Sequence, residues 1–166
     1  MSDAMISRED AERDVILMAR RMALLYYHFA RVLGDELGED EALRILKRVI
    51  EEYGRDCGRR VREFIIGKGL PLSLENYGKA PDLPGLGWKR GTTVAPSGER
   101  RPVVHYCPMA EMWKELGAAE IGRTYCRVDQ AKYRAYNPGI VCVHTKNVLD
   151  GDECCEFGFE SPPAGV

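Results

Sequence analysis

The apolar residues of the first third of the chain repeat at helical spacing. Ser7 followed by Asp10 resembles a capping box, the pair of residues that opens many helices. From there the apolar side chains recur at alternating intervals of three and four residues: Val15, Met18, Met22, Leu25, Phe29 and Val32. This pattern predicts a helix over residues 7–33, and Gly34 is suited to end it in a left-handed cap.

A second periodic series predicts another long helix that ends near residue 66. Its apolar positions are Ala42, Leu46, Val49, Tyr53, Cys57, Val61 and Phe64. Gly54 and Gly58 lie inside this helix, where each costs about 1 kcal/mol relative to alanine, so they indicate a close helix contact or a kink. The first 66 residues are therefore expected to form a helical hairpin.

Residues 67–101 have no sustained periodicity and are rich in proline and glycine. We expect a long irregular connection here. Connections of this length inside a compact domain are uncommon, and they either cover a binding site or cross the surface. Both alternatives stay open for this segment.

The remaining residues, 102–166, alternate between strand and helix signals. The expected elements are a strand at 102–107, a short helix at 109–116, a longer helix at 118–136 and strands at 139–148 and 154–160. Asp150, Gly151 and Asp152 supply a turn, so the last two strands should form a hairpin. The prediction is one α+β domain in which the helical hairpin packs with a C-terminal antiparallel sheet and its helices.

Composition and charge bear on whether the chain binds nucleic acid, membranes or further copies of itself. The net charge of -2 gives no reason to expect nucleic acid, and no apolar run is long enough to span a membrane. The N-terminus lacks the pattern of a signal peptide, so we expect a cytoplasmic protein in which the six cysteines are free thiols. An assembly of several copies would require an exposed apolar stripe on the first helix. Burial of that stripe in the core is the simpler interpretation.

Cys107 is the best candidate nucleophile by position. It ends a strand and precedes Pro108, which suits the first turn of a helix. A thiol at a helix N-terminus lies near unpaired N–H groups, which would lower its pKa and favour the thiolate. A buried cysteine that ends a strand is the equally weighted alternative.

Asp129 is the best candidate for an acid or base. It shares one face of its helix with Cys126 and Tyr125, at spacings of three and four. A carboxylate on a largely apolar face is unfavourable unless it is paired or has a task.

Three other charged residues are candidates for contact with a substrate. Glu111 lies one turn into the helix that follows Cys107, although a solvated charge favoured by the helix dipole is the alternative. Arg123 and Lys132 could hold a substrate carboxylate, although such side chains on helices are usually solvated.

A metal site is a further alternative. Period-two geometry places His105 and Cys107 on one face of their strand, and Cys142 and His144 on one face of theirs. If these strands were neighbours, the four side chains could hold zinc, although buried thiols and histidines are often only packing residues. On the last strand, Cys155 is expected to point inward for packing.

Three segments resemble the L-2-amino-thiazoline-4-carboxylic acid hydrolase family. They are CPMAEMWKELG, EIGRTYCRVDQAKYRAYNP and VHTKNVLDGDECCEF, and they carry a Cys-Pro start, a Tyr-Cys-x-x-Asp helix, an Asn-Pro exit and a Gly-Asp…Cys-x-Phe strand. The resemblance covers residues 106–159. It implies a hydrolase without a cofactor that opens a small cyclic amidine: water adds to the C=N carbon, the ring thiolate leaves, and a carbamoyl-cysteine remains.

The resemblance also implies roles for individual residues. Cys107 becomes a nucleophile or polarising thiol, Asp129 an acid/base group and His144 a proton shuttle, while Tyr125 and Cys126 line the pocket. A more distant similarity to small-ligand-binding vinyl-reductase-type domains supplies the rival function. In that case the chain is a non-catalytic binding or sensing domain for a small molecule.

Overall fold

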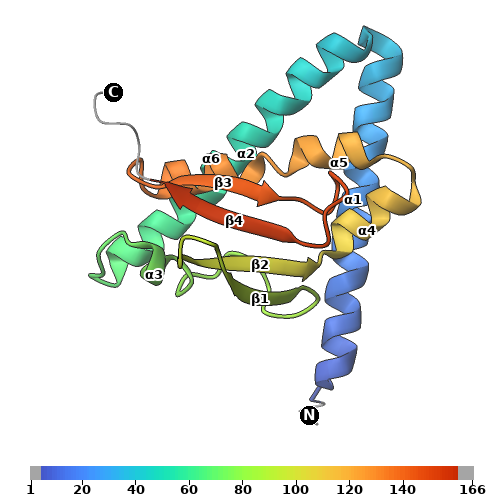
Figure 1. Cartoon of the computed structure of the whole chain (residues 1–166). Coiled ribbons are helices and arrows are strands. Elements are labelled where there is room, and N and C mark those ends of the chain that lie inside the picture. The colour runs from blue at the N-terminus through green and yellow to red at the C-terminus, as the bar shows by residue number, and fades with distance from the viewer. Residues whose placement is uncertain (1–4, 161–166) are drawn as a thin grey trace.

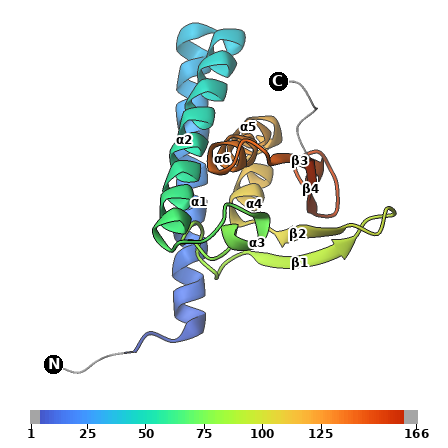
Figure 2. The same ribbon diagram turned by 90° about the vertical axis from the view of Figure 1, so that its left-hand side faces the viewer.

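The computed structural model describes residues 5–160, which form long and short helices and a four-stranded antiparallel sheet (Figure 1). This confirms the predicted α+β class. Seen from the side, the two long helices lie on one side, the shorter helices lie in the middle and the sheet lies on the other side (Figure 2).

The predicted helical hairpin is confirmed. Helix α1 spans Arg8–Leu37 and α2 spans Glu39–Gly67, and the Ser7 hydroxyl caps α1 by accepting the Asp10 N–H at 3.0 Å. The expected stop at Gly34 is wrong. The chain leaves the helix at Gly38, whose φ of 83° suits glycine, and the Gly38 N–H still donates to the Gly34 carbonyl at 2.9 Å.

Residues 67–101 are more ordered than their composition indicates. They include a short helix α3 (Leu74–Tyr77) and a strand β1 (Lys89–Val94), which pairs with β2 (Arg100–Tyr106). The expectation of a wholly irregular segment is therefore wrong. Strand β1 escaped recognition because it lies at the edge of the sheet with mostly exposed residues, so its sequence has no alternation of apolar and polar positions.

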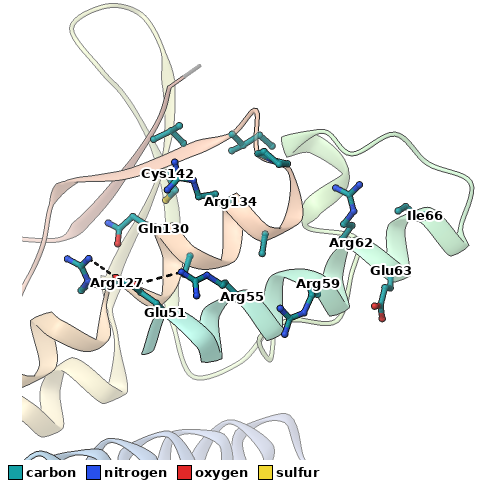
Figure 3. A pocket seen from close by; sticks show the side chains of 15 residues that line it. Glu51, Arg55, Arg59, Arg62, Glu63, Ile66, Arg127, Gln130, Arg134 and Cys142 are labelled. Carbon is teal, nitrogen blue, oxygen red and sulfur yellow. Dashed lines mark hydrogen bonds and ion pairs between the residues drawn. The ribbon is translucent and has the colours of Figure 1, made fainter. Parts of the chain in front are cut away.

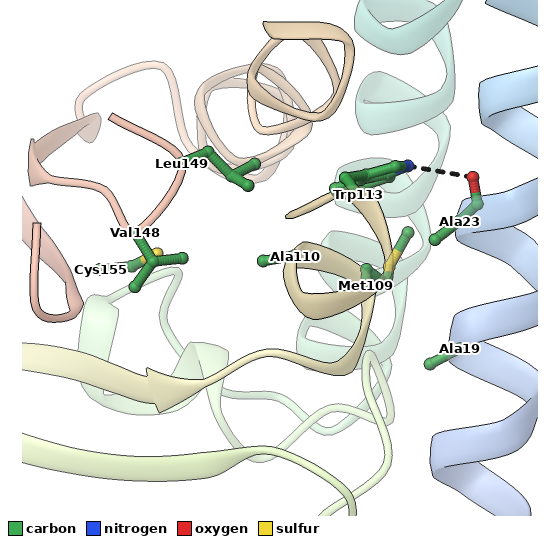
Figure 4. Close-up of a cluster of buried hydrophobic side chains, with 8 residues drawn as sticks. All are labelled: Ala19, Ala23, Met109, Ala110, Trp113, Val148, Leu149 and Cys155. Atoms are coloured by element: carbon green, nitrogen blue, oxygen red, sulfur yellow. Dashed lines mark hydrogen bonds between the residues drawn. The ribbon is translucent and has the colours of Figure 1, made fainter. Parts of the chain in front are cut away.

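The sheet has the strand order β1-β2-β4-β3. Strands β3 (Val141–Lys146) and β4 (Cys155–Glu160) form the predicted hairpin, with His144 opposite Phe157. The inward position predicted for Cys155 is confirmed, since Cys155 is buried in a cluster with Ala110 and Trp113 (Figure 4). This face of the sheet therefore packs against the middle layer of helices.

The helix expected at 118–136 is two helices. Helix α4 (Pro108–Glu115) is followed by α5 (Ala119–Tyr125) and α6 (Val128–Tyr136), with a break at Cys126 and Arg127. The break separates α5, which packs against α1, α2 and α4, from α6, which packs along α2 and against β3.

The close helix contact, one of the two alternatives for Gly54 and Gly58, is confirmed. A Cβ atom at Gly54 would lie 2.6 Å from the Val128 carbonyl oxygen, and one at Gly58 would meet the Lys132 carbonyl and lie 2.9 Å from the Ala135 Cβ. Only glycine lets α2 approach the backbone of α6 this closely. These two glycines therefore set the position of α6, the helix that carries Asp129.

The apolar stripe of α1 is not core, which corrects the simpler interpretation of the sequence. The buried residues of α1 are Ala19, Ala23 and Ala30, and the Trp113 indole donates to the Ala23 carbonyl at 3.0 Å (Figure 4). The large side chains of the stripe lie on the outside: Met18, Met22, Leu25, Phe29 and Val32.

Candidate active site

Asp129 and His144 form a pair between helix α6 and strand β3. Asp129 Oδ2 lies 3.2 Å from His144 Nε2, and His144 Nδ1 lies 3.2 Å from the amide nitrogen of Asn147. The Asn147 oxygen accepts the Leu149 N–H at 2.9 Å, which fixes the orientation of the amide. The amide nitrogen therefore donates to Nδ1, and the ring proton on Nε2 points at Asp129. Both ring nitrogens of His144 are occupied.

Lys132 approaches the other oxygen of Asp129. Its Nζ lies 3.5 Å from Asp129 Oδ1 and 2.8 Å from Asp82 Oδ2, and Asp82 also accepts the Tyr77 hydroxyl at 3.1 Å. Burial alone would lower the pKa of Lys132, but Asp129, Tyr77 and Asp82 raise it well above its ordinary value. Lys132 is therefore a charged ammonium between two carboxylates.

Asp129 is more exposed than His144, to which it is hydrogen-bonded. Burial alone would raise its pKa, but the hydrogen bond from His144 and the charge of Lys132 bring that pKa below its ordinary value. The Asp129 side chain keeps 22% of its surface exposed, whereas the His144 side chain keeps 2%. An ionised carboxylate thus remains within reach of a small molecule, while His144 lies behind it.

The expectation of a low-pKa thiol at Cys107 is wrong. Cys107 does cap α4, but burial raises the pKa of its thiol, and the N–H groups of Ala110 and Met109 and the Trp88 side chain offset this only in part. The cost of desolvating the thiolate exceeds the stabilisation that the N–H groups at the helix N-terminus provide. Cys107 is therefore a neutral thiol at pH 7.

Cys126 lies at the junction of α5 and α6, beside Asn147. Burial raises the pKa of the Cys126 thiol to about 12, against an opposing hydrogen bond with the Asn147 side chain. The charge of the Asp129 carboxylate raises this pKa further. The structure thus brings three thiols together beside Asp129, and burial also raises the pKa of the third, Cys155.

Aromatic side chains pack in the same buried cluster as these thiols. The Tyr125 ring lies 5.3 Å from the rings of both Tyr26 and Trp113, measured between centroids. The Tyr26 hydroxyl is buried and has no hydrogen-bond partner in the part of the chain that the structure describes. A buried hydroxyl of this kind is available to a ligand.

Two predicted substrate-binding residues lie apart from this group. Arg123 pairs with Asp150 at 2.7 Å, and Glu111 pairs with Lys114 at 3.2 Å. Both pairs are partly exposed. Across residues 5–160, no hydrogen bond or ion pair joins Arg123 or Glu111 to Asp129.

The four-ligand metal alternative is contradicted by the strand order. Strand β4 lies between β2 and β3, so His105 and Cys107 are not on a strand next to Cys142 and His144. His105 is exposed and packs over Gly91 of β1. Within the described ranges, no three His, Cys, Asp or Glu side chains are placed to hold a metal ion.

A wide surface groove of about 910 Å³ runs between α2, α6 and the start of β3, and Cys142 is among the residues that line it (Figure 3). Its rim carries five arginines: Arg55, Arg59, Arg62, Arg127 and Arg134. Most are already paired; Arg127, for example, contacts Glu51 at 2.8 Å, and the Arg62 guanidinium donates to the Tyr136 carbonyl at 2.9 Å. None of the predicted catalytic residues lines the groove, so we do not assign the active site to it.

Sequence reasoning missed four residues of the site: Asp82, Trp88, Asn147 and Tyr26. Asp82 and Trp88 belong to the segment 67–101, and their contacts with Lys132 and Cys107 support the alternative in which this segment covers a site. A carboxylate between prolines was a signal that could have been used for Asp82. Tyr26 carried no signal, because its helix position predicts only packing.

The model of the L-2-amino-thiazoline-4-carboxylic acid hydrolase family matches residues 18–159. The chain belongs to this family. The match begins in α1 and ends in β4, so it includes the helical half, beyond the segments 106–159 in which the motifs were found. Searches of curated proteins and of solved structures each gave no match.

None of the helices within residues 5–160 is both long enough and apolar enough to cross a bilayer.

Proposed function

We propose that this member of the family hydrolyses a small cyclic amidine of the 2-amino-thiazoline-4-carboxylate type to a carbamoyl-cysteine. The observation that carries the proposal is the Asp129 carboxylate, which is ionised, partly accessible and held by His144 and Lys132 beside three thiols. The family match supplies the substrate class.

Asp129 is the acid/base group of the proposed reaction. The oxygen of a water molecule adds to the C2 carbon of the amidine, and Asp129 carries one of the water protons to the ring nitrogen. The tetrahedral carbon then forms a C=O bond as the C–S bond breaks, and that electron pair stays on the sulfur. His144 holds one oxygen of Asp129 through its Nε2 proton, so His144 acts as a positioning residue.

Cys107 suits the role of polarising thiol better than that of nucleophile. Its raised pKa keeps the proton on sulfur, so the thiol can give this proton to the departing ring sulfur and regain one from the new hydroxyl group. Tyr125 and Cys126 remain the proposed lining of the pocket. Arg123 remains the proposed partner of the substrate carboxylate, a role that requires it to release Asp150.

A non-catalytic binding domain is the alternative function. Raised thiol pKa values and the low exposure of His144 also suit a packed interior that only holds a ligand. The two functions differ in the product, because a binding domain returns its ligand unchanged.

The test incubates the protein with 2-amino-thiazoline-4-carboxylate and follows carbamoyl-cysteine by mass spectrometry. We expect product from the native chain and loss of at least about a hundredfold in rate for Asp129→Asn. Asp56→Asn is the matched control, because Asp56 pairs with Arg59 and Arg60 on the surface of α2. Calorimetric binding without product would favour the binding domain, and absence of both would overturn the proposal.

A further inference from the structure

Helix α1 exposes a line of large apolar side chains. Met18, Met22, Leu25, Phe29 and Val32 have exposed fractions between 40% and 63%. The face of α1 that packs on the rest of the chain carries Ala19, Ala23 and Ala30 instead. Single exposed apolar residues are ordinary on a protein surface, but a continuous line of them marks an interaction surface.

The spacing of this line, which we call the α1 stripe, indicates what covers it. Together with the half-buried Val15, its residues follow one another at intervals of three and four without a break from Val15 to Val32. This is the seam of a coiled coil, in which each side chain fits between four residues of a facing helix. The stripe therefore fits another helix better than a flat surface or a small ligand.

The stripe is complementary to itself. The intervals three, four, three, four, three read the same from either end, and a valine stands at each end. We propose that two copies of the chain pair through the α1 stripe in antiparallel orientation, about a twofold axis that passes between Met22 and Leu25. In this arrangement Met18 packs against the partner's Phe29, and Met22 packs against the partner's Leu25.

The available area is sufficient for a dimer. The exposed parts of the five large side chains amount to roughly 500 Å² in each copy, so pairing brings together about 1,000 Å², the lower bound for a specific interface. Backbone and flanking side chains add to this area.

The charges beside the stripe argue against a lipid surface. Asp14, Arg21 and Asp35 flank it on one side, so both signs of charge are present. A helix that lies on a membrane instead carries mainly lysine and arginine on its polar face.

These flanking charges do not set the register. A shift of one heptad would pair Arg21 with the partner's Asp35 but would leave Val15 and Met18 uncovered. An exposed ion pair stabilises less than burial of an apolar side chain, so the register that covers the whole stripe is favoured.

The test measures the mass of the full chain in solution by sedimentation velocity. We expect the native chain to be a dimer at micromolar concentration, and Met18→Lys and Phe29→Glu each to weaken dimerisation at least tenfold. The double variant M18K/F29E should regain the dimer, because each lysine then faces the partner's glutamate. Val94→Lys is the control, since Val94 is 65% exposed on β1, outside the stripe, and this variant should remain dimeric.

Each contrary outcome overturns a defined part of the proposal. If the native chain is monomeric at about 100 µM, a second copy is excluded as the occupant. If that monomer also binds anionic phospholipid vesicles, the stripe is a lipid-binding surface instead. If the native chain is a dimer but the double variant M18K/F29E is as monomeric as the two single variants, the antiparallel register is excluded. The substituted side chains are exposed, so the circular dichroism of every variant should match that of the native chain.

Discussion

The Nε2 atom of His144 lies 3.2 Å from Oδ2 of Asp129, and these two residues come from different layers of the molecule. Asp129 lies in the first turn of α6. His144 lies on β3, and its other ring nitrogen accepts a hydrogen bond from Asn147. The contact therefore links the position of the sheet to the charge state of the accessible carboxylate. It also separates the two roles, because only Asp129 retains appreciable exposed surface.

Replacing His144 by glutamine should alter the pH dependence of activity. The hydrogen bond from His144 is the main interaction that lowers the pKa of Asp129, so this pKa should rise in the variant. We expect kcat/KM to fall about tenfold or more through loss of positioning. The acid limb of the pH–rate profile should also move to higher pH. A uniform fall in rate without any movement of the acid limb would contradict this role.

Stability should depend on Asp129 in a defined pH range. The folded-state pKa of Asp129 is below its ordinary value of about 3.9, so its stabilising contribution is complete above that value and is lost as pH falls through the folded-state pKa. Asp129→Asn should therefore lower the free energy of unfolding by roughly 2 kcal/mol at pH 7.

Urea unfolding of both proteins from pH 7 to pH 2.5 measures this difference. The gap between native and variant should be constant above about pH 5 and should narrow below about pH 4. Asp56→Asn, on the surface of α2, is the control. A gap that widened as the pH fell would refute the assignment.

Alanine at Gly58 should destabilise the protein and alter the site. Its Cβ would meet the Lys132 carbonyl and Ala135, so α2 and α6 would have to separate. We expect a loss of about 1–3 kcal/mol in the free energy of unfolding, together with weaker activity, because Asp129 and Lys132 belong to the displaced helix.

Gly34→Ala is the matched control for Gly58→Ala. Gly34 lies inside α1 with open space around its Cβ position, so alanine there should stabilise by about 0.5–1 kcal/mol. Thermal and urea unfolding of the two variants measure both effects. Equal effects of the two substitutions would rule out the close α2–α6 contact as the cause.

Cys107 should react slowly with alkylating agents at neutral pH. Burial raises the pKa of its thiol, so the rate of reaction with iodoacetamide should keep rising above pH 9. Mass spectrometry of each modified cysteine across the pH range identifies the site. A rate for Cys107 that reaches its plateau below pH 7 would show a thiolate and restore the role of nucleophile.

The sequence by itself determined the elements whose signals are local. The Ser7 cap, the two long helices and the β3–β4 hairpin were predicted, because helix periodicity and strand alternation act between residues near in the chain. Gly54 and Gly58 indicated a close contact or a kink, but not that α6 is the partner. The motif segments around Cys107, Asp129 and His144 also sufficed to predict the family that the match over residues 18–159 supports.

Only the tertiary structure decided how these elements combine. The strand order places β4 between β2 and β3 and so removes the metal alternative, and burial reverses the expected pKa shift of Cys107. Asp82 forms an ion pair with Lys132, which lies 50 residues later in the chain. The α1 stripe lies outside, although its periodicity is that of a core helix. Periodicity reports which residues share a face, whereas burial, solvation and long-range pairing depend on what that face meets.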